Sequence, residues 1–560
     1  MNGRALLGAI AFRPRLLEHW RTYRAEDFRA DLASGITVGV VALPLAMAFG
    51  IASGVRPEQG IVTAVVAGFL ISALGGSRVQ IGGPAGAFVA LLYAIAEKYG
   101  VANLLIATSM AGVLLFAMGV ARLGNLVRFV PVSIIAGFTA GIAVIVGLSQ
   151  VKDFLGLPIA KMPANFFSQL SALGGAISHV NVYALVIGAT SLLAIVLWPV
   201  SYQSNPQRWR RITAKLPSTL VVLVVWSALV AWLGWPVETI GSRFGGLPSG
   251  LPMPAMPHFD WETAKHLVAP TLAIALLGAI ESLLCARVAD GMIEDRHDPN
   301  QELMAQGIAN FFTPFFGGIA ATGTIARTVT NVRSGARSPV AGIVHALTLL
   351  SIILLAAPYA AHVPMAALAA ILLWVAYSMA DWHAFGKLGQ FTVFYRTTFL
   401  ATFLMTVVFD LIVAVETGLV LASLFFILRM SSLTRVDDIA LSAEQAAGPE
   451  GRRVAGYRLF GSLFFGSVTK IEFLLDPRRE LPDILVLEMS RLINVDTTGL
   501  EAIEALHVRL QRMGGELHLA GANEQPMDIM QRSGFIAKLG EARVHADLET
   551  ALAAARGSEG

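Results

Sequence analysis

The sequence predicts an α-helical polytopic membrane protein that ends in a small α/β domain. Of its 560 residues, 55% are hydrophobic and only 14% are charged, whereas roughly a quarter of the residues of a soluble protein are charged. Apolar windows long enough to cross a bilayer recur between Asp31 and Arg429. After Arg429, short β-like runs alternate with amphipathic helical patterns. These observations exclude a wholly soluble protein.

We expect about fourteen membrane-spanning segments, because a helix needs about 20 mostly apolar residues to cross the hydrocarbon core. Two of the expected segments are short. The expected spans are 33–54, 58–76, 81–97, 101–119, 126–149, 180–199, 215–234, 269–288, 300–317, 323–335, 339–357, 364–379, 395–411 and 412–429.

The distribution of Lys and Arg over the loops predicts the orientation of these spans. With the N-terminus in the cytoplasm, the arginine-rich stretch 208–211 lies inside, and the external loop 358–362 carries no Lys or Arg. An even number of spans returns the C-terminus to the cytoplasm. No cleavable signal peptide follows the N-terminal arginines. We therefore expect a multi-pass protein of the cell inner membrane with both termini cytoplasmic, and the net charge of +3 does not indicate binding to nucleic acid.

Two glycine-rich breaks interrupt apolar segments in opposite halves of the chain. They are 80–88 (QIGGPAGAF) and 317–327 (GGIAATGTIAR). Irregular backbone at membrane depth is tolerated only where it lines a cavity or is buried in protein. The breaks lie about 240 residues apart, as two repeated halves require, and seven spans per half make the repeat inverted. Paired breaks of this kind indicate the substrate site of a transporter.

An acidic residue, Glu281, lies near the centre of the expected span 269–288. An ionisable residue at that depth is costly and usually marks an ion path or a proton relay. Its carboxyl group could take up and release a proton as its exposure changes. Glu281 is therefore the candidate coupling residue, with a structural hydrogen bond between helices as the alternative.

A basic residue, Arg327, lies about one turn into the short span that follows the second break. Its guanidinium can offset the charge of an anion, and the start of a helix adds unpaired N–H groups. The first break supplies a second helix start near Pro84, because Pro is favoured in the first turn of a helix. Two helix N-termini and one arginine form an anion site. The alternatives are that Arg327 pairs with Glu281 or extends to a membrane interface.

Other reactive residues give no sign of catalysis. His179, His345 and His362 lack the spacing of metal ligands, and the single cysteine, Cys285, excludes an intrachain disulfide. No nucleophile is paired with a base. We therefore expect neither an enzyme nor a metal cofactor.

The expected domain organisation follows from these patterns. A cytoplasmic N-terminal segment (1–30) precedes a transmembrane domain (31–430), and a polar linker (431–453) leads to an α/β domain (454–556). In that last domain we expect strands at 457–465, 484–489 and 516–520, with helices at 498–513 and 524–533.

The chain resembles the sulfate permease family, also called solute carrier family 26. The runs that carry the resemblance are Asp31–Gly39, Gly82–Pro84, Ile280–Leu283 and Asn310–Pro339, and the C-terminal part resembles the STAS domain of that family. The resemblance implies fourteen spans in two inverted repeats of seven, divided into a core and a gate domain. It also implies a homodimer and an elevator-like movement of the core.

The resemblance also implies a substrate site between the two half-helices, flanked by the first and eighth spans. Members often carry Ser at position 326, so we expect no hydroxyl contact from Ala326. After Pro57 and Gly60 this chain has Ile61 and Val62, where the family usually has Leu-Tyr. The implied substrate-binding residues are Ala85, Gly86, Ala87, Thr324, Ala326 and Arg327, with Glu281 in ion coupling.

In the C-terminal domain, the run Asp496–Gly499 resembles the STAS loop at which anti-sigma-factor antagonists are phosphorylated. This makes Thr497 a candidate regulatory site. A helix cap explains the same residues without a kinase, and it is the favoured interpretation. We expect the domain to bind a cytoplasmic protein partner.

The function that we expect is secondary transport of a small anion across the lipid bilayer. Several runs, including Leu276–Cys285 and Ile325–Arg327, look most like the C4-dicarboxylate transporters of the family, so proton-coupled uptake of succinate or fumarate is the first hypothesis. Sodium-coupled transport of bicarbonate or sulfate is the alternative. A membrane scaffold or sensor that acts through the STAS domain is an alternative of another class.

Overall fold

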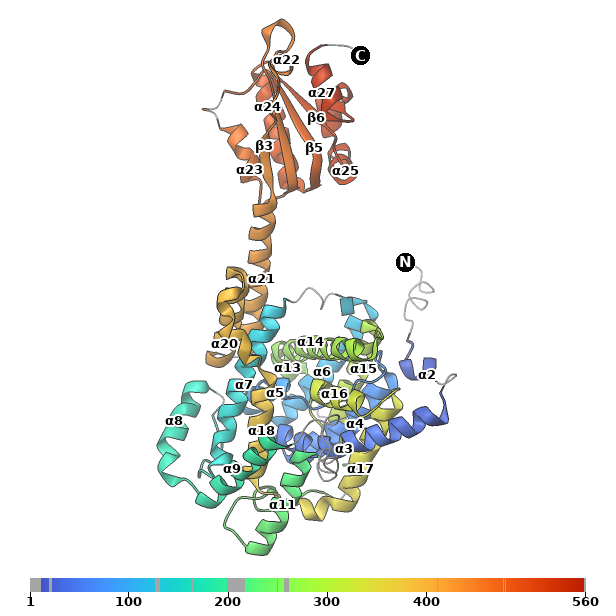
Figure 1. The fold of residues 1–560 in the computed structure, drawn as a ribbon, viewed down its shortest axis with the longest axis vertical. Helices are drawn as coiled ribbons and strands as arrows, with labels where there is room; N and C mark the ends of the chain where they lie inside the picture. Colours follow the sequence, from blue (N-terminus) through green and yellow to red (C-terminus); the bar gives the residue numbers. More distant parts are fainter. Residues whose placement is uncertain are drawn as a thin grey trace, which may run out of the picture. The chain divides into compact units, whose positions relative to one another are not determined.

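The computed structural model describes residues 12–19, 23–125, 131–163, 165–198, 217–248, 250–255, 261–409, 411–476, 478 and 480–557. The chain divides into two compact units, Met1–Leu419 and Val420–Gly560. Figure 1 shows helices throughout the first unit and a sheet with helices in the second.

The first unit consists mostly of helices, and most of the long ones overlap a predicted span. Parts of four predicted spans (126–130, 199, 215–216 and 410) lie outside the described residues. The long helices are α3 (Ala25–Ala52), α4 (Pro57–Leu74), α5 (Gly86–Tyr99), α6 (Val101–Val120), α7 (Val132–Phe154), α8 (Phe166–Ala176), α9 (Val182–Leu197), α11 (Ser218–Leu233), α14 (Val268–Ile293), α15 (Pro299–Phe312), α16 (Ile325–Arg333), α17 (Val340–Ala360), α18 (Met365–Met379), α20 (Val393–Val408) and α21 (Leu411–Leu433). Four short helices are α2 (Arg15–His19), α12 (Ile240–Phe244), α13 (Trp261–His266) and α19 (Trp382–Gly386). Helix α8 matches no predicted span, and α21 continues from the first unit into the second.

Length and apolar composition identify a subset of these helices as membrane spans. Among the described residues, α3, α4, α6, α7 and α14 are each long and apolar enough to cross a bilayer. The segments Phe166–His179 and Val182–Leu197 meet at 115° and together would make a sixth. The count of fourteen spans stays a prediction, because this criterion identifies at most six spans among the described residues.

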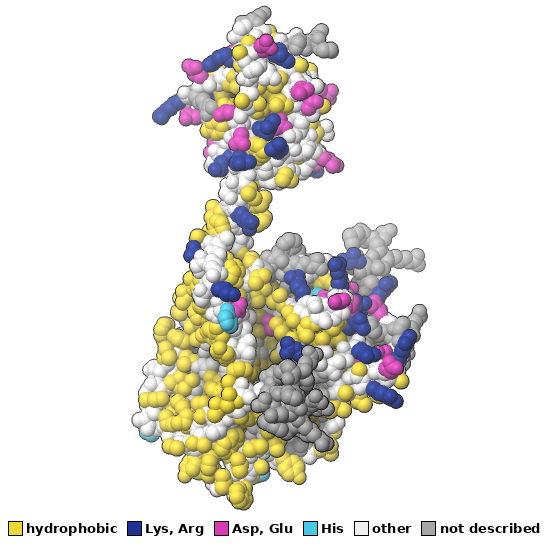
Figure 2. Space-filling view, viewed as in Figure 1, with side chains coloured by type: hydrophobic (Ala, Val, Ile, Leu, Met, Phe, Trp, Pro, Cys, Tyr) yellow, Lys and Arg dark blue, Asp and Glu magenta, His cyan; other side chains and the backbone are white. Residues whose placement is uncertain are grey.

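Apolar side chains cover much of the visible surface of the first unit (Figure 2). Val182, Leu197 and Trp232 are exposed by 66%, 71% and 81%. A surface of this kind is unfavourable in water and suits contact with lipid chains. The arginines and acids near α2 and the start of α3 form a separate charged region in the same view.

The helices of the first unit form two bundles. In the first bundle α3 packs against α17 and α4, and α6 packs against α15 and α14. In the second bundle α7 packs against α18 and α20, and α18 also packs against α9. Glycines permit the close approaches in the first bundle. A Cβ atom on Gly35 of α3 would lie 2.5 Å from the carbonyl oxygen of Ala341 in α17.

A two-stranded ladder joins the two breaks inside the first bundle. Strand β1 (Gly82–Gly83) pairs antiparallel with β2 (Thr322–Gly323), with Gly82 opposite Gly323. A Cβ atom on Gly323 would overlap the side-chain amide of Gln80, so a larger residue there would have to displace that amide. The irregular backbone that the sequence predicts at membrane depth is thus buried in protein, and the two breaks form backbone hydrogen bonds with each other.

The second unit is an α/β domain around a five-stranded sheet of order β3-β4-β5-β6-β7. Strand β3 is antiparallel to β4, and the other neighbours are parallel. Helices cover both faces, and strand β3 lies within the segment expected to be a linker. The strands are β3 (Arg435–Asp438), β4 (Val454–Leu463), β5 (Ile484–Val495), β6 (Glu516–Ala520) and β7 (Val544–His545), and the helices are α22 (Ala443–Ala446), α23 (Thr469–Glu472), α24 (Thr497–Arg512), α25 (Glu524–Arg532), α26 (Phe535–Leu539) and α27 (Leu548–Ala555).

Two histidines of this domain form a hydrogen-bonded pair between neighbouring strands. His518 of β6 and His545 of β7 have stacked rings, and Nδ1 of His518 lies 2.9 Å from Nε2 of His545. Burial, and then the neighbouring ring, lowers the pKa of His518, against a smaller opposing effect of Glu516; Arg543 also lowers it slightly. Burial lowers the pKa of His545, and Asp547 opposes this. The folded domain therefore disfavours protonation of the pair.

We expect the sheet edge formed by β6 and β7 to lose stability as the pH falls below the ordinary pKa of histidine, about 6.5. The unfolded chain binds more protons than the folded chain in that window, whereas above it the stabilisation is complete. Amide hydrogen exchange of the intact protein, corrected for intrinsic rates, should show falling protection in β6 and β7. The variant with both His518→Gln and His545→Gln should show a flatter profile. Constant protection in the unaltered protein would contradict the prediction.

Candidate functional site

The two half-helices begin at the ladder formed by β1 and β2. Helix α5 starts at Gly86, shortly after β1, and α16 starts at Ile325, shortly after β2. Because the strands are antiparallel, the helices leave the ladder in opposite directions and both N-terminal ends lie beside it. This arrangement follows from the Gly- and Pro-rich breaks, which stop one helical run and start the next.

Neither helix start is capped by a side chain. The residues that precede them, Ala85 and Thr324, have extended backbones and make no capping hydrogen bond through their side chains. The Thr324 hydroxyl instead donates to the carbonyl oxygen of Ile81, 3.0 Å away. The first N–H groups of both helices therefore remain available, and the helix dipoles add positive potential at the ladder.

The guanidinium of Arg327 is buried in the first bundle without a hydrogen-bond partner. The residue is 1% exposed, and none of its three side-chain nitrogens has a partner among the described residues. A Cβ atom on Gly83 would lie 2.4 Å from Nη1 of Arg327, so this glycine makes room for the guanidinium against β1. The alternative in which Arg327 pairs with Glu281 is thus not observed. An uncompensated charge of this kind is costly, and a bound anion would offset it.

His345 of α17 is a neighbour of this site that is absent from the residues predicted from the sequence. Its side chain is fully buried, and neither ring nitrogen has a partner among the described residues. A Cβ atom on Gly68 would lie 3.2 Å from the carbonyl oxygen of Gly82 and 3.5 Å from Cε1 of His345, which places the ring close to β1. The sequence does contain an indication of this role, because His345 is an ionisable residue within an expected span, as Glu281 is.

Glu281 lies on α14, which runs alongside the ladder. The carbonyl oxygen of Gly278 accepts from the Thr322 hydroxyl at 3.2 Å, and the Cys285 thiol donates to the Thr328 hydroxyl at 3.2 Å. These contacts on either side of Glu281 connect α14 with β2 and α16. Glu281 itself is partly exposed, and among the described residues its carboxyl group forms no hydrogen bond or ion pair. The structural hydrogen bond considered as an alternative is therefore not observed.

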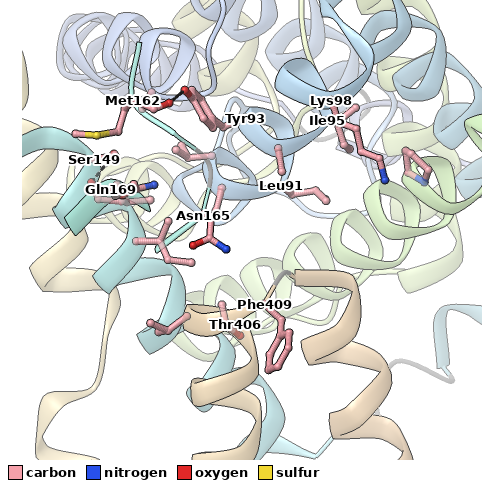
Figure 3. Close-up of a pocket in the computed structure, with 18 of the residues that line it drawn as sticks. Leu91, Tyr93, Ile95, Lys98, Ser149, Met162, Asn165, Gln169, Thr406 and Phe409 are labelled. Carbon is pink, nitrogen blue, oxygen red and sulfur yellow. Dashed lines mark hydrogen bonds between the residues drawn. The ribbon is translucent and has the colours of Figure 1, made fainter. Parts of the chain in front are cut away.

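A cavity of about 360 Å³ lies between the two bundles, next to α5 (Figure 3). Its lining includes Val89 and Ala90, which lie about one turn beyond the start of α5. Most of the lining is apolar, with polar side chains from Ser149 and Asn165 on one side. The cavity therefore ends about one helical turn from the start of α5, which is one of the two predicted anion-binding helix starts.

The structure brings the predicted substrate-binding residues and Glu281 together around the ladder, whereas Thr497 lies in the other unit. Thr497 is the exposed first residue of α24. The preceding Asp496 accepts a hydrogen bond from the Gly499 amide at 2.8 Å and from the Phe465 amide at 3.1 Å. This is the cap that the sequence favours. Phosphorylation of Thr497 stays a prediction.

Comparison with known proteins gives consistent matches over nearly the whole chain. The model of the sulfate permease family matches residues 28–402, and that of the STAS domain matches residues 449–551. The chain is 42% identical over 530 residues to "Putative sulfate transporter YvdB" of Bacillus subtilis. The aligned region covers 94% of this chain and 98% of the relative. It is 30% identical over 545 residues to "Bicarbonate transporter BicA" of Synechocystis sp., covering 94% of each.

Two solved structures share the fold. The murine Slc26a9 anion transporter in the inward-facing state matches with a TM-score of 0.85 at 17% identity, covering 100% of this chain and 95% of that chain. The transmembrane domain of a cyanobacterial bicarbonate transporter BicA matches with a TM-score of 0.61 at 29% identity, covering 72% and 98%. The predicted fold class, a helical membrane transporter with a C-terminal STAS domain, is confirmed.

Proposed function

This chain belongs to the sulfate permease family, and on that premise we propose that it is a secondary active transporter of a small oxyanion. The family consists of anion transporters, so the chain is a transporter and not an enzyme, as the sequence predicts. The substrate, the coupling ion and the site residues are the parts that we propose.

One observation carries the proposal: two uncapped helix starts lie beside a buried guanidinium that has no partner in the described chain. Backbone N–H groups at a helix start bind anions, and the positive end of the helix dipole favours them. Arg327 adds a full charge that costs free energy until an anion arrives. Such a site favours the bound state over the empty one.

Sulfate and bicarbonate are the first candidates for the anion. They are the substrates in the names of the relatives described above, whereas none of those names contains a dicarboxylate. Backbone amides and one arginine accept any of these oxyanions, so their chemistry alone does not discriminate among them. Uptake of C4-dicarboxylates therefore stays a prediction of the sequence.

Uptake into proteoliposomes tests the proposed function directly. Labelled sulfate, bicarbonate, succinate and fumarate are offered in turn, each with a proton gradient, with a sodium gradient and with neither. We expect saturable, gradient-dependent accumulation of at least one of the first two anions. Failure to accumulate or exchange any of the four would contradict the proposal, and flux that neither saturates nor counter-exchanges would indicate a channel.

We propose that Glu281 couples uptake to an ion, with a proton first and sodium as the alternative. The Glu281→Gln variant keeps the shape of the side chain but has no titratable group. It should lose the effect of the ion gradient while retaining exchange of labelled anion for unlabelled anion. Asp290→Asn on the same helix is the matched control and should keep the gradient effect, because Asp290 already bonds to His297. Unchanged gradient-driven uptake in Glu281→Gln would exclude the coupling role.

The cellular setting is also a proposal. We place the protein in the cell inner membrane with both termini in the cytoplasm, supported by the positive charges of the predicted internal loops. A homodimer and a cytoplasmic protein partner of the STAS domain remain proposals that the resemblance to the family supports.

A further inference from the structure

The two helix starts at the candidate anion site differ in exposure. On α16, Ile325 is 38% exposed, and Ala326 is exposed as well. On α5, by contrast, Ala85 is 5% and Ala87 1% exposed. The backbone chemistry of the two starts is similar, so the difference comes from the side chains that cover α5.

Met379 is the side chain nearest to the first residue of α5. A Cβ atom on Gly86 would lie 2.7 Å from Sδ and 3.3 Å from Cε of Met379, and 3.3 Å from Cε1 of Phe49. The thioether therefore occupies the space in which any other residue at position 86 would place its side chain. Gly86 is the first residue of α5, so this contact is made directly at the uncapped end of the helix.

Met379 belongs to the second bundle, whereas α5 starts in the first. It is the last residue of α18, a helix that packs mainly against α7 and α9 of the second bundle and less extensively against α3 of the first. Nε1 of Trp382 donates to the carbonyl oxygen of Tyr377 at 2.7 Å and so closes the chain around Met379. The Trp382 ring lies 6.0 Å from that of Phe385, which packs against Phe399 of α20 at 5.0 Å. The backbone of Met379 is thus held by the second bundle while its side chain reaches the first.

We propose that Met379 sets the upper size of the anion that the start of α5 admits. The inference rests on the proposed function and names the class of substrate that the site selects, namely compact oxyanions in preference to longer dicarboxylates. Met has an unbranched, flexible side chain that fills irregular space. It adjusts to a compact anion but leaves too little room for a chain of several carbon atoms.

Competition for uptake by anions of increasing length tests the inference. Sulfate, malonate, succinate and glutarate compete with the labelled anion that the unaltered protein accumulates. We expect Met379→Ala to improve inhibition by succinate and glutarate about tenfold relative to sulfate, the effect of about a methylene or more in a binding pocket. Met379→Leu, which keeps the volume, should retain the original order.

The matched control is Leu373→Ala on the same helix. Leu373 faces α7, where a Cβ atom on Gly147 would lie 3.9 Å from its Cδ2. This variant should leave selectivity unchanged. An unaltered selectivity in Met379→Ala, or an equal change in Leu373→Ala, would overturn the size limit but not the proposed function. If the unaltered protein accumulates no anion, the proposed function fails, and the size limit fails with it.

A double variant tests the contact itself. Gly86→Ala inserts a methyl group 2.7 Å from Sδ of Met379, which must shift within the space beside the helix start where the anion is proposed to bind, so uptake should fall. Combining it with Met379→Ala removes the clash, and uptake should be faster than in Gly86→Ala alone, limited by the remaining 3.3 Å approach to Phe49. If the double variant is as slow as Gly86→Ala alone, Met379 does not occupy this space during transport and the inference is wrong.

Discussion

Arg327→Met is expected to abolish anion uptake and, at the same time, to raise the thermal stability of the anion-free protein. The buried guanidinium has no partner among the described residues, and an uncompensated buried charge costs several kcal/mol. Methionine retains much of the length of the side chain and removes that cost. The gain in stability and the loss of function have the same origin, as is common at binding sites.

Thermal unfolding with and without the transported anion measures both parts of this prediction. A ligand that binds only the folded state stabilises it by about 2.7 kcal/mol at a concentration of 100 times its dissociation constant. The unaltered protein should show such an increase, and Arg327→Met should show none.

The control for this prediction is an arginine that does have a partner. Arg243 lies 2.9 Å from Asp153, which is itself buried, so Arg243→Met should lower stability. A loss of stability in Arg327→Met comparable with that of Arg243→Met would indicate a structural role for Arg327. Retained uptake in Arg327→Met would show that transport of the anion does not depend on the charge of Arg327.

Gly307→Ala is expected to destabilise the protein severely, although alanine is the better helix former. A Cβ atom at this position in α15 would lie 2.5 Å from the Phe116 amide nitrogen and 2.7 Å from the Gly112 carbonyl oxygen, both in α6. These are backbone atoms, so the two helices must move apart. Overpacking of this kind costs about 1–3 kcal/mol or more. The contact between α6 and α15 is central to the first bundle.

Gly291→Ala provides a control with the opposite sign. Gly291 lies in α14, and no atom lies within 4 Å of an added Cβ there. Replacing Gly by Ala within a helix stabilises it by about 1 kcal/mol when nothing clashes. The unfolding temperature and the monodisperse fraction in detergent should therefore rise slightly for Gly291→Ala and fall for Gly307→Ala. A change in the same direction for both would contradict the packing argument.

Much of the site could be predicted from local sequence. The run from Gln80 to Phe88 and the run from Gly317 to Arg327 contain the Gly and Pro residues that end helices, and the structure has a helix start in each. The sequence does not determine whether Arg327 pairs with Glu281. Their positions in the sequence do not determine whether the two side chains meet, because this depends on which face of α16 lies against β1.

His345 and Met379 show why the rest could not be predicted. The sequence shows His345 as an ionisable residue within an expected span and Met379 as an ordinary apolar residue, but it does not show that each approaches the first break, which is hundreds of residues away. His345 approaches Gly82 because Gly68 has no side chain, and Met379 approaches α5 because Gly86 has none. Such contacts depend on pairs of residues in different helices.

By itself the sequence determined the membrane class, the positions of the helices and the two places where helices start at membrane depth. The reason is that a lipid environment requires each span to satisfy its own hydrogen bonds, which makes length, hydropathy and helix-ending residues informative. Only the tertiary structure decided that Arg327 lies unpaired against Gly83 and that Met379 covers Gly86. Packing between helices is set by distances of a few tenths of an ångström at the missing Cβ atoms of glycines, and no local pattern contains those distances.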